Sequence, residues 1–373
     1  MSAGARQRRA ADILGNGPAA LTAAITLARR GWAVSVRGPT RSTKCTPRID
    51  LLAGSAVATL ERLGVSRDDL HAVASSCPGT WSNWEADGPA AFDYLATPGG
   101  PAWAVDRTAF EHLLKERAVE AGVAFQSAIE SLRFDAATFE HSSEEERGWL
   151  ILAAGRLASV PRSGDRPDDR LIALVGLGRM SASAEPPDRR LIVEAVSDGW
   201  VYVLAGPGSI LCCGVITDLP ALAGKRPQNF AADAVGRTER VGLFLQRLDG
   251  PLGFTATPVP CRWLPLVADP KSIRIGDAHA SYDPVAGRGL WEALRGAEEI
   301  ALTLDREPER LGRLERRSRY AYIRYLVERE EMYRRGGDRF GSGFWMRRRT
   351  ADPDRQRAII ASRVFTRNQS LGS

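Results

Sequence analysis

The sequence predicts a mixed α/β (α+β) fold in which a strand-helix-strand unit is combined with an antiparallel sheet and a C-terminal helical segment. Residues 11–14 form an apolar run that leads into a glycine-rich turn, a helical pattern and a second apolar run at 32–36. Three apolar runs separated by turn residues lie between 190 and 218, and helical periodicity dominates from residue 306 onward. These three observations predict the fold class.

Composition limits the class of protein. The 373 residues, 44% of them hydrophobic, suffice for about two globular domains. Neither a secretory signal nor an apolar stretch long enough to span a membrane is visible, so we expect a cytoplasmic protein without a membrane span. The five cysteines form no C-x-x-C pair and the four histidines are scattered, so we expect no disulfide framework and no metal site. Although the net charge is +6, the arginines of 306–349 alternate with glutamates, which favours a solvated helix face over nucleic-acid binding.

The first glycine-rich turn carries the pattern Gly15-x-Gly17-x-x-Ala20 between a strand and a helix. In such a turn the first glycine permits the tight bend, the second lets the backbone approach a pyrophosphate, and the small third residue allows the helix to pack on the strand. The turn therefore predicts a dinucleotide site that comprises Gly15, Gly17, Pro18, Ala19 and Ala20. An acidic residue is expected at the end of the second strand, but Arg37 stands there, facing either the pyrophosphate or solvent.

Further elements follow from periodicity and turn signals. Residues 49–63 and 107–121 are predicted to be amphipathic helices, and 191–193, 200–204 and 210–216 to be strands of an antiparallel meander. Residues 273–275 form a short strand of the first kind again, followed by a second glycine-rich helix start. Because the two kinds of pattern alternate along the chain, we expect two interleaved domains.

The second glycine-rich segment reads Gly276-Asp277-Ala278, then Asp283-Pro284-Val285-Ala286-Gly287-Arg288-Gly289-Leu290. It resembles the G-D-A-x-x-x-x-x-P-x-x-G-x-G motif of the para-hydroxybenzoate-hydroxylase-like flavin monooxygenases. The resemblance implies a Rossmann-like FAD-binding domain of the glutathione-reductase type, in which Asp277 would bind the ribityl chain. Gly287 and Gly289 would let the next helix direct its N-terminus at the N1–C2 edge of the flavin, where reduced flavin is negatively charged. The implied cofactor-binding residues of this segment are Gly276, Asp277, Pro284, Gly287, Arg288, Gly289 and Leu290.

Two shorter matches support the resemblance. Residues 105–110 resemble the family's D-R-x-x-F/L helix, whose arginine, here Arg107, would lie beside the cofactor; a surface charge at a helix start is the alternative. Residues 152–156 stand where the family has D-A-x-G-R, but Leu152 replaces the acid. Together with Arg37, this departure indicates a divergent branch.

The C-terminal segment narrows the resemblance. Residues 320–333 and Phe344-Trp345-Met346-Arg347-Arg348-Arg349 resemble the endings of the tryptophan-halogenase-like flavoproteins that assist quinone-cofactor formation, the LodB- and QhpG-like maturation proteins. Within the basic segment 316–349, six aromatic residues would line a groove for an extended polypeptide, or else pack helices onto the core: Tyr320, Tyr322, Tyr325, Tyr333, Phe344 and Trp345. The candidate substrate-binding residues are Trp81, Trp84, Trp103 and Trp345. The halogenases' catalytic lysine has no clear match, because the context of Lys44 differs.

The expected domains are discontinuous. Residues 1–75, 105–160 and 265–305 form the predicted FAD-binding domain, 76–104 and 161–264 the substrate domain, and 306–373 the C-terminal helical region. The predicted function is an FAD-dependent monooxygenase that uses O2, with NAD(P)H or a partner reductase as electron source, and hydroxylates an electron-rich, tryptophan-like group.

Several alternatives stay open at this stage. The substrate is a Trp-containing peptide or protein, or a free aromatic small molecule. Halogenation and a flavin-binding maturation protein without turnover are alternative functions. His279 and Asp283, which lie within the second motif, are the candidates for proton transfer, although sequence position alone assigns no such role.

Overall fold

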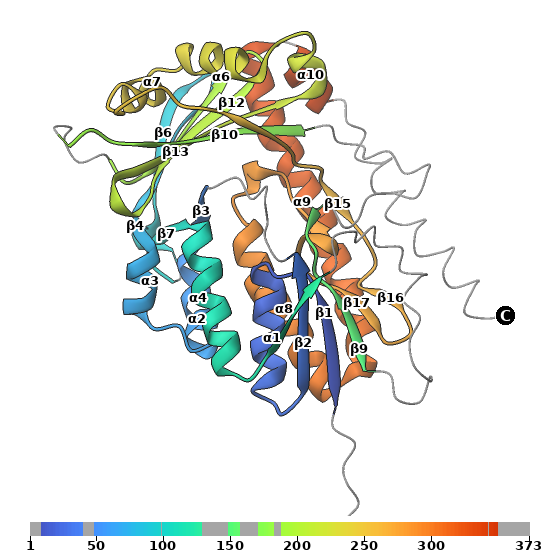
Figure 1. The fold of residues 1–373 in the computed structure, drawn as a ribbon. Helices are drawn as coiled ribbons and strands as arrows, with labels where there is room; N and C mark the ends of the chain where they lie inside the picture. The colour runs from blue at the N-terminus through green and yellow to red at the C-terminus, as the bar shows by residue number, and fades with distance from the viewer. Residues whose placement is uncertain are drawn as a thin grey trace, which may run out of the picture.

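The computed structural model describes residues 9–39, 48–97, 99–128, 148–156, 171–182, 188–341 and 343–349. Two large sheets dominate these residues, one in the lower and one in the upper part of the view in Figure 1. The predicted mixed α/β fold is confirmed. None of the helices in the described ranges has the length and apolar character that crossing a membrane requires.

The lower sheet has six strands in the order β16-β17-β9-β1-β2-β8. All neighbours pair in parallel except β16 and β17, which are antiparallel. The strands are β1 (Ala10–Leu14), β2 (Ala33–Pro39), β8 (Ala124–Ala128), β9 (Trp149–Leu152), β16 (Val267–Asp269) and β17 (Ser272–Arg274). A core between this sheet and three long helices, α1 (Pro18–Ala28), α4 (Arg107–Glu120) and α8 (Gly289–Arg306), contains Ile13, Ile25, Phe110 and Leu294, each fully buried.

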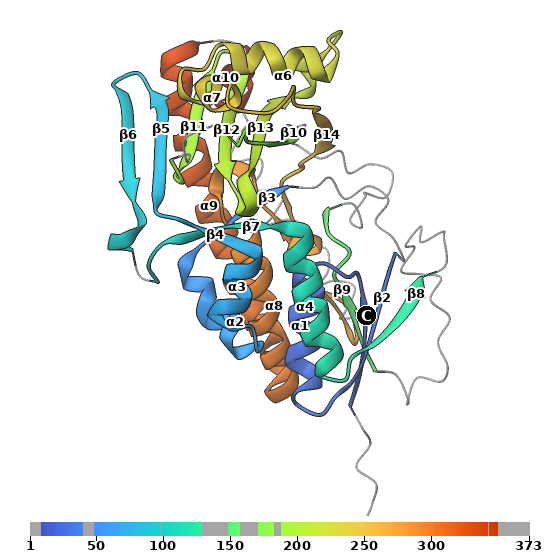
Figure 2. The ribbon, with the colours of Figure 1, turned by 60° about the vertical axis from the view of Figure 1, so that its left-hand side comes forward.

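The upper sheet has seven strands in the order β14-β10-β13-β12-β11-β5-β6. They are β5 (Gly79–Glu85), β6 (Gly88–Asp93), β10 (Leu171–Arg179), β11 (Leu191–Val196), β12 (Gly199–Ala205), β13 (Ile210–Asp218) and β14 (Thr255–Pro258). The predicted meander is β11-β12-β13, and it is confirmed. Figure 2 shows the β5–β6 hairpin at one edge of this sheet. Strands β5 and β6 precede β9 in the sequence and the other five strands follow it, so two separate segments of the chain build the upper sheet. The expected domain boundaries remain a prediction.

The remaining elements cover the sheets or connect them. Helices α6 (Pro227–Gly236) and α7 (Arg240–Leu245) cover one face of the upper sheet, as Figure 1 shows. The short strands β3 (Ile49–Leu52), β7 (Ala102–Asp106) and β4 (Ala74–Cys77) form a small sheet between the two large ones in Figure 2. The others are α2 (Val57–Arg62), α3 (Arg67–Val73), α5 (Leu219–Leu222), β15 (Arg262–Trp263), β18 (Ala280–Ser281), α9 (Leu311–Phe340) and α10 (Gly343–Arg349).

One expected helix is wrong in part. Residues 49–52, predicted as the start of a helix over 49–63, form strand β3, which pairs antiparallel with β7. Only residues 57–62 form the α-helix α2, after a single 3-10 turn at Gly54–Ala56. Because a short apolar run has no clear period, tertiary pairing decides between helix and strand. The helix predicted at 107–121 is confirmed as α4.

The aromatic residues of α9 and α10 pack in two clusters, Tyr333, Phe344 and Trp345 against the upper sheet, and Tyr322 and Tyr325 with Trp263 and Tyr282. Tyr322, Tyr325, Tyr333, Phe344 and Trp345 are at most 2% exposed. The indole N–H of Trp345 donates to the carbonyl of Val196 in β11 at 2.9 Å. Of the six aromatic residues expected to line a groove, only Tyr320 is exposed, at 65%. The expected groove is therefore wrong for these residues, because burying large rings against the sheet stabilises the terminal helices more than exposing them would.

Gly336 lets α9 and α10 pack closely. A Cβ at this position would lie 2.2 Å from the nearest ring atom of Trp345, whereas a Cβ at Gly312, near the start of the same helix, would meet only an Arg316 nitrogen at 3.9 Å. We predict that Gly336→Ala lowers the free energy of unfolding by about 1–3 kcal/mol through overpacking. The matched variant Gly312→Ala should change it by less than about 1 kcal/mol, in the stabilising direction. Chemical denaturation of both variants tests this, and equal stability would contradict the packing described.

Candidate functional site

The candidate site lies where three parallel strands of the lower sheet end. Strands β1, β9 and β17 are hydrogen-bonded neighbours that run in the same direction and end at Leu14, Leu152 and Arg274. The segments that follow them are the first glycine-rich turn, residues 153–156 and the Gly276-Asp277 turn. In open parallel sheets, ligands bind outside the carboxyl ends of the strands. The topology thus brings both glycine-rich motifs to the edge where a ligand is expected.

Two glycines allow these segments to touch. Gly15 has φ +123°, and a Cβ on it would lie 2.3 Å from the carbonyl oxygen of Ala153, at the end of β9. Gly276 has φ +57°, and a Cβ on it would lie 2.6 Å from the Cβ of Ala19 in α1. At both positions the backbone has a positive φ and the neighbouring segment lies so close that any side chain would clash with it. Gly15 N–H also donates to the carbonyl of Arg37 at 2.8 Å, which fixes the turn against β2.

Gly17 differs from these two glycines. Its φ of −80° and ψ of 179° are extended values that any residue adopts, and a Cβ there would meet nothing closer than the Nη2 of Arg107 at 4.0 Å. Neither the backbone nor the packing of the described residues demands glycine here. The position instead leaves open space beside the N-terminus of α1 and a guanidinium group. A phosphate or pyrophosphate fits this arrangement, because free N–H groups and a cation both favour an anion.

Arg107 is held in place by two carboxylates. Its Nη1 donates to Asp50 at 2.9 Å and its Nε to Glu111 at 2.6 Å. Asp50 also accepts from Nε of Arg48 at 2.9 Å. Burial raises the pKa of Asp50, but the two guanidinium groups outweigh it and hold the pKa below its ordinary value. Sequence reasoning missed Asp50 because it expected a helix over 49–63, and it missed Arg48, which directly precedes strand β3, because no motif marked it.

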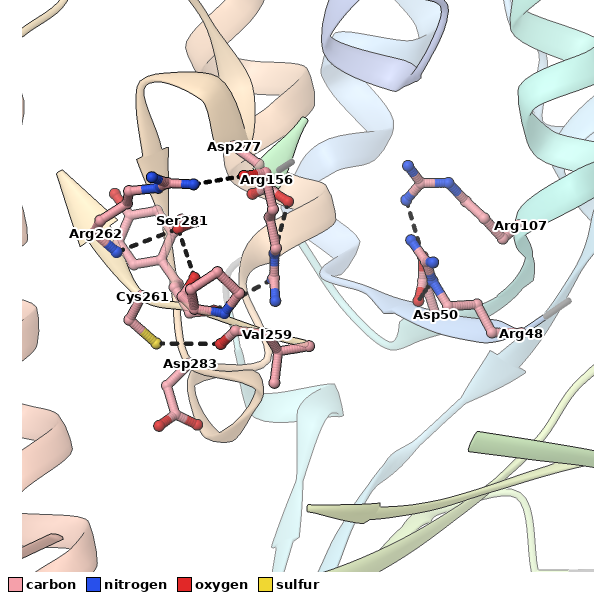
Figure 3. A network of polar contacts seen from close by, with 12 residues as sticks. Arg48, Asp50, Arg107, Arg156, Val259, Cys261, Arg262, Asp277, Ser281 and Asp283 are labelled. Atoms are coloured by element: carbon pink, nitrogen blue, oxygen red, sulfur yellow. Dashed lines mark hydrogen bonds and ion pairs between the residues drawn. The ribbon is translucent and has the colours of Figure 1, made fainter. Parts of the chain in front are cut away.

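A second ion pair lies across the site in Figure 3. Arg156 donates from Nε to Asp277 at 2.9 Å, and the carbonyl of Arg156 accepts from Nη2 of Arg262 at 2.6 Å. Burial alone would lower the pKa of Arg156, but Asp277 outweighs it and the pKa is raised. The like charge of Arg48 opposes this rise in the pKa of Arg156. Asp277, which the resemblance assigned to the ribityl chain, therefore lies at the sheet edge with a fixed arginine partner, 31% exposed.

The second glycine-rich segment turns sharply before α8. Pro284–Ala286 is a single 3-10 turn, Gly287 follows with φ +60°, and α8 begins at Gly289. No Cβ contact within 4 Å exists at Gly287 or Gly289. Arg288 points to α9, because it donates to Glu328 at 2.9 Å and its guanidinium carbon lies 5.5 Å from the Tyr325 ring centroid. Leu290, only 5% exposed, packs into the core and supports the turn from below.

The first segment is equally compact around its helix start. Pro18, Ala19 and Ala20 are buried in the first turn of α1. Arg37 lies at the neighbouring strand, where its Nη2 is 3.7 Å from Asp12. Of the residues predicted to bind a cofactor, the structure thus brings together Gly15, Gly17, Ala19, Arg107 and the Gly276-Asp277 turn, with Arg37 beside them.

His279 is a buried structural residue. Its Nδ1 lies 2.7 Å from the carbonyl of Leu264, so Nδ1 carries the proton and donates, and Nε2 accepts from the Ser318 hydroxyl at 2.6 Å. Burial lowers its pKa to about 4; the hydrogen bond to Leu264 opposes this, and the charge of Arg274 adds to it. A neutral imidazole with both nitrogens engaged joins a loop to α9. Because Nδ1–H is engaged by the Leu264 carbonyl and Nε2 by the Ser318 hydroxyl, the geometry gives no support to proton transfer at His279.

The four tryptophans chosen as substrate-binding residues do not come together. The ring centroids of Trp84 and Trp345 lie 5.3 Å apart in the core that packs against the upper sheet, and both side chains are less than 9% exposed. Trp81 packs with the residues of the opposite face, where Arg240 lies 4.6 Å from its ring centroid. Trp103 is buried in the lower core against His71. Trp84 and Trp345 therefore serve packing, and their indole N–H groups donate to the backbone carbonyls of Met332 and Val196.

The fold is shared with known structures. QhpG, a peptidyl tryptophan dihydroxylase essential for tryptophylquinone cofactor biogenesis, matches with a TM-score of 0.69 and 22% identity over 91% of this chain and 78% of its own. CmlS, a flavin-dependent halogenase, matches with a TM-score of 0.77 and 20% identity over 99% of this chain and 71% of its own. This chain has the fold of QhpG and the flavin-dependent halogenases.

A third structure of this fold is CndH, a myxobacterial chondrochloren halogenase described as a variant of FAD-dependent halogenases. It has a TM-score of 0.70 and 17% identity over 98% of this chain and 92% of its own. No protein-family model and no curated protein sequence matches the chain. The resemblance inferred from the two glycine-rich motifs and the tail is thus confirmed at the level of the fold.

The buried state of His279 predicts a specific pH dependence of stability. Its folded-state pKa of about 4 lies below the ordinary value of 6.5, so the unfolded chain takes up a proton that the folded chain excludes. The stability it contributes is present above pH 6.5 and is lost as the pH falls toward 4. Between pH 6.5 and pH 4, the free energy of unfolding of the wild-type protein should fall. We predict that in His279→Gln it falls by about 2–4 kcal/mol less over the same range. The exposed His112 on α4 supplies the control variant His112→Gln, which should keep the wild-type profile; identical profiles for both variants would contradict this.

Proposed function

We propose that this protein is an FAD-dependent monooxygenase that hydroxylates an electron-rich, tryptophan-like aromatic group. The observation that carries the proposal is Gly17, whose open position beside α1 and Arg107 has no explanation in the chain's own backbone or packing. A dinucleotide explains it, because a pyrophosphate needs close approach to backbone N–H groups. The second glycine-rich turn, which touches α1 through Gly276 and Ala19, would then lie along the same cofactor.

The chain's residues suggest a division of labour around the bound cofactor. FAD, when bound, supplies the redox chemistry and the activation of O2. Gly15, Gly17 and the N-terminus of α1 would bind the pyrophosphate, with Arg107 as the cationic partner. Asp277, kept in position by Arg156 at 2.9 Å, would accept a hydrogen bond from the ribityl chain. The N-terminus of α8 would direct its positive end at the flavin, which favours the anionic reduced form by about 0.3–2 kcal/mol.

The fold of QhpG supports a tryptophan side chain as substrate, and a polypeptide as its carrier. The aromatic tail no longer supports the carrier, because its rings are buried. Halogenation is the second candidate, since CmlS and CndH share the fold across almost the whole of this chain. NADH, NADPH or a partner reductase would reduce the flavin.

Replacement of Gly17 tests the cofactor assignment without disturbing the fold. A valine Cβ at this position meets no atom closer than 4.0 Å, so Gly17→Val should unfold at the wild-type temperature as apoprotein. We predict that its flavin occupancy after purification falls at least about tenfold, because the side chain fills the space of the pyrophosphate. Gly296→Ala, on an open position of α8, is the matched control and should keep full occupancy. A folded Gly17→Val protein with full flavin would refute the assignment.

The reaction is tested by product mass. We expect oxygen consumption in the presence of NADH, NADPH or a reductase to depend on an indole-containing compound or peptide, and the product to gain one or two oxygen atoms. The same assay in chloride and bromide separates the second candidate, because a halogenated product shows the isotope pattern of the halogen. Incorporation of halogen without oxygen would replace hydroxylation by halogenation, and oxygen uptake that no aromatic compound affects would count against both.

A further inference from the structure

A buried hydrogen-bonded network joins the turn before α8 to the C-terminal helix α9. Its centre is Asp283, which is 1% exposed. Its Oδ1 accepts from the backbone N–H of Val285 at 3.0 Å, and its Oδ2 accepts from the Tyr333 hydroxyl at 2.9 Å. Its own backbone N–H donates to the Tyr325 hydroxyl at 2.6 Å. Two tyrosines of one helix thus hold the backbone and the side chain of a single residue.

The same helix is fastened to the upper sheet. Tyr333 is 1% exposed, and its hydroxyl also accepts from the indole N–H of Trp200 in β12 through a long contact of 3.4 Å. The carbonyl of the preceding residue, Met332, accepts from the indole N–H of Trp84 in β5 at 2.7 Å. The network therefore runs from two strands of the upper sheet, through α9, to the second glycine-rich motif.

The connection from Asp283 to α8 is short and conformationally restricted. Only the 3-10 turn Pro284–Ala286, the left-handed Gly287 and Arg288 separate it from the first residue of the helix. Proline fixes its own φ, and the Asp283 carboxylate fixes the N–H of Val285. Any shift of the Tyr333 hydroxyl is consequently passed on to the N-terminus of α8.

We infer that Asp283 is a positioning residue, held by Tyr333, that sets the direction of the N-terminus of α8 and links it to the upper sheet. The inference rests on the proposed function in one respect, namely that this helix end faces the flavin. It replaces the expectation that Asp283 transfers protons: an enclosed carboxylate whose two oxygens accept from Val285 and Tyr333 suits a structural clamp.

The test compares Tyr333→Phe with Tyr322→Phe. Both remove one hydroxyl from a buried tyrosine of α9, but the Tyr322 hydroxyl donates to the backbone carbonyl of Ser281 at 3.1 Å, whereas the Tyr333 hydroxyl donates to the Asp283 carboxylate. Hydrogen exchange is measured on the apoprotein, so that the result does not depend on flavin binding. We expect the Val285 amide to exchange about fivefold faster in Tyr333→Phe, the factor expected from one lost hydrogen bond. Tyr322→Phe should leave the Val285 amide at the wild-type rate.

A second readout uses the flavin-loaded protein. The visible absorption band and the reduction potential of the bound flavin should shift in Tyr333→Phe and stay at the wild-type values in Tyr322→Phe. Unchanged exchange at Val285 in Tyr333→Phe, or equal acceleration in both variants, would overturn the positioning role. If Tyr333→Phe does not fold, Asp283→Asn provides the same exchange measurement with the same expected direction. A wild-type protein that binds no flavin would refute the proposed function and leave the exchange result valid.

Discussion

The site depends on the close contact of two glycine-rich turns. Gly15 packs against the carbonyl of Ala153, and Gly276 packs against Ala19, both at distances that exclude a side chain. These contacts are possible because β1, β9 and β17 are adjacent and parallel, so that the segments after them start from one edge. Without this approach, the N-termini of α1 and α8 would not lie on the same side of the sheet. The close approach of the two turns is therefore a consequence of strand order combined with two residues that lack a Cβ.

The ionic residues at this edge have a consistent arrangement. Arg107 is held by Asp50 of β3 and by Glu111, and Arg156 is held by Asp277, which belongs to the second glycine-rich turn. Partly buried arginines held in this way lose little further freedom when an anion arrives. The Nη2 of Arg107 is thus held beside Gly17 before any ligand binds, which is what preorganisation of a site means physically.

The sequence predicts the site better than its surroundings. The unit at residues 10–39 and the Gly276-Asp277 turn have local requirements, a tight bend and a small residue at fixed spacing, and these are visible in the letters alone. Strand β3 was missed because the pairing of Ile49–Leu52 with β7 joins residues far apart in sequence. The aromatic residues of α9 and α10 looked like a binding surface because composition does not reveal which side of a helix is covered. Arg48, Asp50 and the Asp283–Tyr333 contact depend on the same kind of long-range information.

We propose that the edge formed by β1, β9 and β17 binds a flavin dinucleotide. The most direct measurement is a titration of the apoprotein with FAD, FMN and NAD+, followed by chromatography of the flavin that the purified protein releases on denaturation. The account predicts that FAD is released and that FMN binds about ten- to hundredfold more weakly, since FMN lacks the pyrophosphate and each charge-assisted hydrogen bond to it contributes about 1.5–3 kcal/mol. Release of FMN, or tighter binding of NAD+ than of FAD, would contradict it.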